Sequence, residues 1–205
     1  MLSRTRLVPA ALTLVVTLLL PAATRAEISC SAPGAGGLRL CTAGIATGAI
    51  ATVANRQAET RWCWAATISN VFGYYGHPVA QARVVKETYG RVANVAGSEA
   101  AMASDLNRTW TDDRGKRFQV VADDVLAPSA AEELARGRPL IVTMRNHAVI
   151  LTGLTYVRHP DGSGQVEGAT VRDPWPANPN EQRLTPADWQ STRHRFRIRI
   201  YNIDS

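Results

Sequence analysis

The chain has 205 residues, of which 45% are hydrophobic and 20% charged, and its formal net charge is +6. Of its 23 basic residues, Arg4, Arg6 and Arg25 lie in the first 26 positions, which leaves 20 against 17 acidic residues and lowers the net charge to +3. Without a dense Lys/Arg cluster, so small a charge argues against a nucleic-acid partner.

The N-terminus has the pattern of an export signal. Arg4 and Arg6 precede an apolar run over residues 7–20, and small residues follow at Thr24 and Ala26. This run is shorter than the roughly 20 residues of a membrane span, and no later run exceeds it. We therefore expect a signal peptide over residues 1–26, a secreted or periplasmic protein without integral membrane association, and one domain over residues 27–205. Residues 27–55 are a propeptide, an N-terminal arm or an integral part of that domain.

The three cysteines divide unevenly. Cys30 and Cys41 lie in a Gly-rich segment, and we expect them to form a disulfide, as exported proteins often do. Cys63 is then an odd thiol, which in an exported protein calls for an explanation.

Helices are predicted first along the chain. Apolar residues at helical spacing follow Cys63, and Gly76 ends that segment. Further helices are expected over residues 79–89 and 98–109. A fourth is expected to begin with a capping box of Ser129 and Glu132 and to end before Gly137.

Strands are predicted beyond that point. Residues 139–144, 147–157, 165–173 and 195–203 are rich in β-branched residues, and residues 118–121 add a further strand. The order of elements predicts an α+β fold, in which a helical N-terminal half packs on a mostly antiparallel β-sheet C-terminal half. A cleft between the halves is the expected site.

The residues that are able to take part in catalysis lie on both halves. Cys63 begins a helix, where the thiolate form is favoured. His147 begins a strand and Asp173 ends the next one, so a hairpin would bring them to the same end of the sheet. Gln57, six positions before Cys63, offers an amide donor for an oxyanion.

These residues resemble a known family. QAETRWCWAA is similar to the nucleophile segment of papain-like cysteine peptidases, and NHAVILTGLTY is similar to their histidine strand. VRDPWPANP resembles the Asp-Pro segment of the C39-like branch and of secreted bacterial enzymes of the AvrRpt2 type. The resemblance implies a papain-like fold and peptide-bond hydrolysis. It assigns Cys63 as nucleophile, His147 as general base, Asp173 as orienting acid and Gln57 as oxyanion donor, with Asp in place of the Asn of plant papains.

Other assignments follow from position. Trp62, Trp64, Asn146 and Trp175 are the candidates for substrate binding. The remaining histidines have no metal-ligand spacing, so we expect neither a metal nor a cofactor. The expected partner is a protein or peptide substrate. Two alternatives stay open at this point: an amidase or acyltransferase that uses the same triad on cell-wall peptides, and a catalytically silent papain-like binding module.

Overall fold

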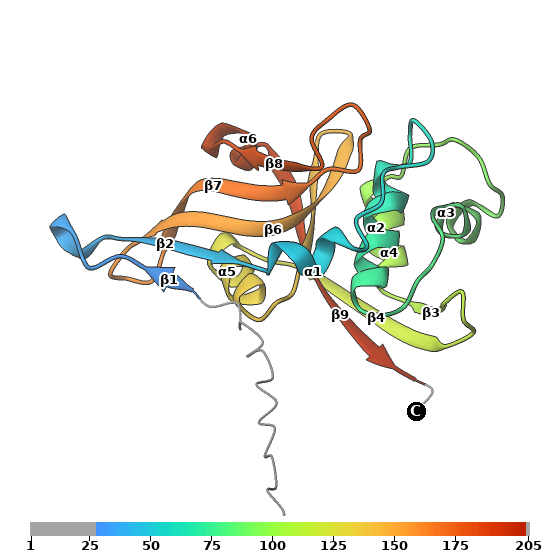
Figure 1. Cartoon of the computed structure of the whole chain (residues 1–205), viewed down its shortest axis with the longest axis horizontal. Helices are drawn as coiled ribbons and strands as arrows, with labels where there is room; N and C mark the ends of the chain where they lie inside the picture. Colours follow the sequence, from blue (N-terminus) through green and yellow to red (C-terminus); the bar gives the residue numbers. More distant parts are fainter. Residues whose placement is uncertain (1–27, 204–205) are drawn as a thin grey trace, which may run out of the picture.

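The computed structural model of the chain describes residues 28–203, and the predicted signal peptide lies outside them. One antiparallel sheet runs through the molecule, with helices gathered beside one of its ends (Figure 1). The strands follow the order β1-β2-β6-β5-β9-β4-β3, while β7 pairs with β6, and β8 with β7. Their bounds are β1 Ser29–Cys30, β2 Arg39–Gly44, β3 Thr109–Thr111, β4 Arg117–Asp124, β5 Leu140–Met144, β6 His147–Arg158, β7 Gly164–Arg172, β8 Glu181–Leu184 and β9 Thr192–Asn202.

Not all helices belong to the group at that end of the sheet. Helix α2 packs against β6 and α3, and α5 packs across β2, β6 and β7. In Figure 1, α2, α3 and α4 form a helical group at the right, which is the predicted helical half. The predicted α+β class is therefore confirmed. The helices are α1 Thr47–Ala51, α2 Cys63–Tyr74, α3 Gln81–Tyr89, α4 Glu99–Asp105, α5 Ala127–Ala135 and α6 Pro186–Gln190, with a short 3-10 turn at Ala35–Gly37.

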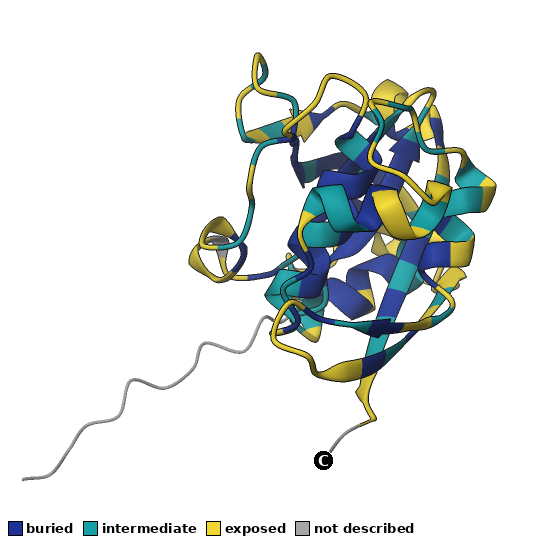
Figure 2. Cartoon of the chain, turned by 90° about the vertical axis from the view of Figure 1, so that its right-hand side faces the viewer, coloured by how far each residue is buried: buried dark blue, intermediate teal, exposed yellow. Residues whose placement is uncertain are grey.

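Helix α2 is the central helix of the core. It is buried on nearly every side, because its apolar residues are not limited to one stripe. Phe72 packs edge-to-face on Trp110 and on Phe118, with ring centroids 5.4 and 5.2 Å apart. Figure 2 shows the buried residues gathered in the interior and the exposed ones along loops and strand ends. Such packing joins the C-terminal half of α2 to β3 and β4.

The N-terminal segment is part of the sheet. Residues Arg39–Gly44 of β2 pair with β6, and the Cys30–Cys41 disulfide joins β1 to β2, as predicted. Ile45 and Ile50 are buried in the core. These contacts favour the interpretation of residues 27–55 as an integral part of the domain, although the domain bounds stay a prediction.

Two predicted helix boundaries are wrong. The capping box expected at Ser129 does not exist, because Pro in the first turn lets α5 begin at Ala127, and Ser129 lies inside the helix. A capping box does form at α6, where Thr185 and Asp188 cap each other. The helix expected to reach Thr109 ends at Asp105, because β3 pairing with β4 takes up Thr109.

Candidate active site

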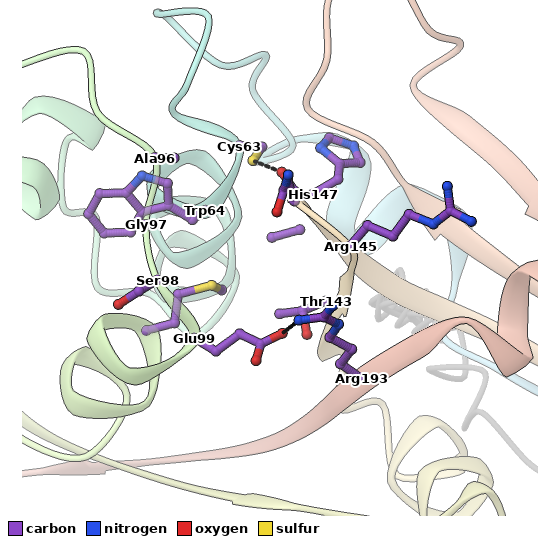
Figure 3. A pocket seen from close by; sticks show the side chains of 13 residues that line it. Cys63, Trp64, Ala96, Gly97, Ser98, Glu99, Thr143, Arg145, His147 and Arg193 are labelled. Carbon is purple, nitrogen blue, oxygen red and sulfur yellow. Dashed lines mark hydrogen bonds and ion pairs between the residues drawn. The ribbon is translucent and has the colours of Figure 1, made fainter.

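Cys63 is the first residue of α2 and the free cysteine of the chain. It is half-buried, and its Sγ lies 3.9 Å from the carbonyl oxygen of Asn146 on the sheet side (Figure 3). The helix places its positive N-terminal end behind this sulfur, which favours negative charge there. The location is therefore the one that the sequence predicted, at a helix tip facing the sheet.

His147 begins β6 and faces both other members of the predicted triad. Its Nε2 lies 2.8 Å from Oδ1 of Asp173, and its side chain lines both cavities at the site together with Cys63. Burial works against the charged imidazolium, but the hydrogen bond to Asp173 and the nearby groups of Asp173 and Cys63 outweigh it and raise the pKa of His147 to about 9. The imidazole is therefore protonated at neutral pH.

Asp173 follows β7 directly, and the β6–β7 hairpin brings it beside His147. The register pairs Ile150 with Arg172, so the start of β6 and the end of β7 lie at the same end of the sheet. Its Oδ1 also accepts the backbone N–H of Trp175, and its Oδ2 accepts the side-chain amides of Asn178 and Gln182, each at 2.8 Å. Burial opposes the charged carboxylate, but these donors and His147 hold the pKa of Asp173 below its usual 3.8. It is a fixed negative charge.

Asn178 and Gln182 are positioning residues that the sequence analysis missed. Gln182 lies on β8, whose pairing with β7 carries its amide beneath the carboxylate. Neither amide has a local sequence signal. Gln182 is revealed by the pairing of β8, a short strand that was not predicted, and Asn178 by the turn that follows Asp173.

Gln57 is buried beside Cys63 but already has a partner. Its Nε2 donates to the carbonyl oxygen of Glu59 at 2.7 Å, and its backbone N–H bonds the carbonyl oxygen of Pro174. Its Oε1 is buried without a hydrogen-bond partner among residues 28–203. Exchanging the amide N and O would set two acceptors against each other at Glu59, so the assignment stands. The second N–H of this amide remains for a ligand.

Two cavities meet at Cys63. One, of about 250 Å3, extends toward Glu99 and Met102 of α4, and the other, of about 530 Å3, extends toward Gln57. Both are lined by Cys63, His147, Asn146 and the Ala96–Gly97 loop, so together they form a groove between the helical half and the sheet. This is the predicted cleft.

The loop before α4 was not predicted as part of the site. A Cβ on Gly97 would lie 2.5 Å from the ring of Trp64, so only glycine lets this loop lie against Trp64. Trp64 borders the smaller cavity from the core, and Trp175 borders the larger one. Trp62 lines neither cavity, because its buried indole donates to the carbonyl oxygen of Ala93.

Within the described part of the chain, no group of three or more His, Cys, Asp or Glu residues could hold a metal ion. No helix of residues 28–203 has the length and apolar character that crossing a bilayer requires.

Comparisons with known proteins identify the family. A search of solved structures finds the peptidase domain of Streptococcus ComA, described as a bi-functional ABC transporter involved in a quorum-sensing pathway. That match has 16% sequence identity and a TM-score of 0.46, and it covers 74% of this chain and 97% of that one. A search of curated proteins finds no match. A family model described as "Peptidase_C39 like family" matches residues 50–198, which is most of the chain and includes every member of the predicted triad. The chain belongs to the peptidase C39-like family.

Proposed function

We propose that the protein is a cysteine peptidase that cleaves peptide bonds through a thioester on Cys63. One observation carries the proposal: His147 lies beside Cys63 at the meeting point of the two cavities, and its Nε2 is hydrogen-bonded to the carboxylate of Asp173. This is the nucleophile, base and orienting acid of a triad. A binding module would have no use for such an arrangement.

The first half of the reaction is acyl transfer to sulfur. An imidazolium next to a thiol favours the thiolate, whose sulfur attacks the carbonyl carbon of the scissile bond. The resulting oxyanion takes hydrogen bonds from the backbone N–H of Cys63 and the free N–H of the Gln57 amide. When the C–N bond breaks, His147 gives its proton to the leaving amine, and a thioester remains on Cys63.

The second half is hydrolysis of that thioester. His147, now neutral, takes a proton from water as the hydroxyl oxygen attacks the thioester carbon. The C–S bond then breaks, which releases a carboxylic acid product and restores the thiolate and imidazolium. Because Nε2 of His147 is bound to Asp173, the other ring nitrogen, Nδ1, exchanges the protons. Asp173 holds the ring in this orientation throughout.

The groove suits an extended chain. It is open at both cavities and passes Cys63 between the Ala96–Gly97 loop and Asn146, so a protein or peptide segment is the substrate that we propose. Asn146, Trp64 and Trp175 line it and remain our candidates for substrate contacts. Trp62 is not a candidate, because it lines neither cavity.

We also propose that the protein acts outside the cytoplasm. The Cys30–Cys41 disulfide is typical of oxidising compartments, and the predicted signal peptide agrees with it. N-terminal sequencing of the mature protein checks both this proposal and whether residues 27–55 are retained. The relation to AvrRpt2-type enzymes stays a prediction.

The test combines labelling with product analysis. Iodoacetamide at neutral pH should label Cys63 selectively, and Cys63→Ala should abolish cleavage of a casein-type substrate while keeping the circular dichroism spectrum of the wild type. The disulfide-bonded residues serve as the internal control for labelling. Unchanged cleavage by Cys63→Ala would remove this residue from the mechanism.

The same assay separates the alternative activities. Mass spectrometry of products formed from proteins, from cell-wall peptides and in the presence of added amines distinguishes hydrolysis of a protein from amidase or acyltransferase chemistry. Products found only with wall peptides or amines would replace the peptidase assignment, and binding without any product would indicate a silent module.

A further inference from the structure

The smaller cavity beside Cys63 ends at a charged group that the proposed mechanism does not use. Glu99, in the first turn of α4, extends toward Arg193 of β9 across the end of this cavity, so an ion pair joins the helical half to the sheet (Figure 3). The distance between Oε1 of Glu99 and Nη1 of Arg193 is 3.6 Å. Oε2 of Glu99 lies 3.4 Å from Nε2 of His194.

The two partners of this ion pair are unequal. Oε1 of Glu99 is buried and, in the part of the chain that the structure describes, accepts no hydrogen bond, while the Glu99 side chain as a whole is 36% exposed. The Arg193 side chain is 62% exposed. A buried acceptor without a donor is costly, whereas an exposed ion pair contributes little, so Arg193 can turn into solvent at a cost of about fivefold or less in binding. The carboxylate of Glu99 keeps its contact with His194 at the end of the cavity.

The walls of the cavity suit a long aliphatic stem. Trp64, Met102 and Ala148 are buried apolar residues that line it between Cys63 and Glu99. A lysine or arginine side chain buries its methylene groups against such walls and places its charged head at the far end. Arg145, the other arginine of the lining, extends away from both Cys63 and Glu99 in Figure 3.

We infer that this cavity is a specificity subsite for a basic side chain of the substrate, and that Glu99 is its specificity-determining residue. The lysine or arginine head displaces Arg193 and donates to Oε1 of Glu99. An acidic side chain is disfavoured, because it would have to approach Arg193 beside the fixed charge of Glu99. The inference rests on the proposed peptidase function and adds the substrate class: peptides with a basic residue near the cleaved bond.

Fluorogenic peptides test the inference. Lysine and its uncharged isostere norleucine are placed in turn at each of several positions on either side of the scissile bond, and kcat/KM is measured. At one position, lysine should exceed norleucine by about tenfold or more, as expected for a hydrogen bond to a charged group. A ratio near one at every position would overturn the inference.

Variants identify the receptor. Glu99→Gln should bring the lysine-to-norleucine ratio down to about one, because the charge of the acceptor is gone. Arg193→Gln should raise the ratio by up to about fivefold, because a competing cation is removed. Glu59→Gln is the matched control: its exposed carboxylate lines neither of the two cavities at Cys63 but a separate one beside Gln57, so its loss should leave the ratio unchanged. A ratio that persists in Glu99→Gln, or that falls in Arg193→Gln, would contradict the assignment.

A binding measurement separates the proposed peptidase function from the proposed basic subsite. Fluorescence anisotropy with Cys63→Ala measures peptide affinity without chemistry, alone and combined with Glu99→Gln. If the wild type cleaves nothing but Cys63→Ala prefers lysine peptides in a Glu99-dependent manner, the subsite stands and the peptidase function fails. If cleavage occurs with no lysine preference, the function stands and the subsite is wrong.

Discussion

Replacing Asp173 by Asn tests whether its charge sets the protonation of His147. The amide oxygen of Asn can still accept from His147 and the Trp175 N–H, while its NH2 group faces Asn178 and Gln182, whose amides rotate to present oxygen. The shape of the site is thus kept, and the negative charge is lost.

The magnitude follows from the two sources of the raised pKa. The pKa of His147 is raised from 6.5 to about 9 by Asp173 and Cys63 together, against burial. With Asp173 neutral, burial and the thiol remain, and we expect the pKa to fall by at least about one, to between about 7 and 8. At pH 8.5 a group of pKa 9 is about three-quarters protonated and one of pKa 7.5 about one-tenth protonated, a difference of about eightfold.

The assay is the pH dependence of kcat/KM, which reports the ionisation of the free enzyme. The wild type should lose activity as the pH rises through about 9, because the imidazolium that protonates the leaving amine is lost. In Asp173→Asn this loss should move to a lower pH. Gln182→Ala is the control, since it removes one donor to Asp173 but keeps the charge, and its alkaline limb should stay near that of the wild type. If the alkaline loss of kcat/KM in Asp173→Asn occurs at the same pH as in the wild type, the reasoning is refuted.

Three further predictions concern stability. Gly97→Ala should lower the free energy of unfolding by about 1–3 kcal/mol and reduce kcat/KM, because its Cβ meets Trp64 at 2.5 Å; Gly48→Ala, which meets nothing within 4 Å, is the thermal-denaturation control. Replacing both Cys30 and Cys41 by Ser should cost about 3 kcal/mol in denaturant titrations through freedom gained by the unfolded chain, with kcat/KM unchanged, and a loss near zero would contradict this. The pKa of His147 is raised in the folded protein, so its contribution to stability is complete below pH 6.5 and lost as pH rises through about 9. The pKa of Asp173 is lowered, so its contribution is complete above pH 3.8 and lost in acid below it. Urea unfolding across pH 5–10 checks the His147 window, in which His147→Ala should show a flatter profile than the wild type.

The sequence was most informative where local signals were strong. Cys63 precedes a long apolar helix, and Gly76 ends that helix in the left-handed region at φ 86°. The β6–β7 hairpin was predictable because its strands are rich in β-branched residues and flank an evident turn. The prediction from sequence was wrong where two local signals compete. At Ser129 the adjacent Pro moved the start of the helix.

By itself, the sequence determined that Cys63 begins a helix, that His147 begins a strand and that Asp173 follows the next one, because helix starts, strand starts and hairpins are local properties of the chain. Tertiary structure decided what surrounds them. The partners of Asp173 on β8, the Gly97 loop against Trp64, and the Glu99–Arg193 pair across the groove join segments far apart in the chain. Such contacts arise from packing and strand pairing, which fix distances that no local pattern encodes.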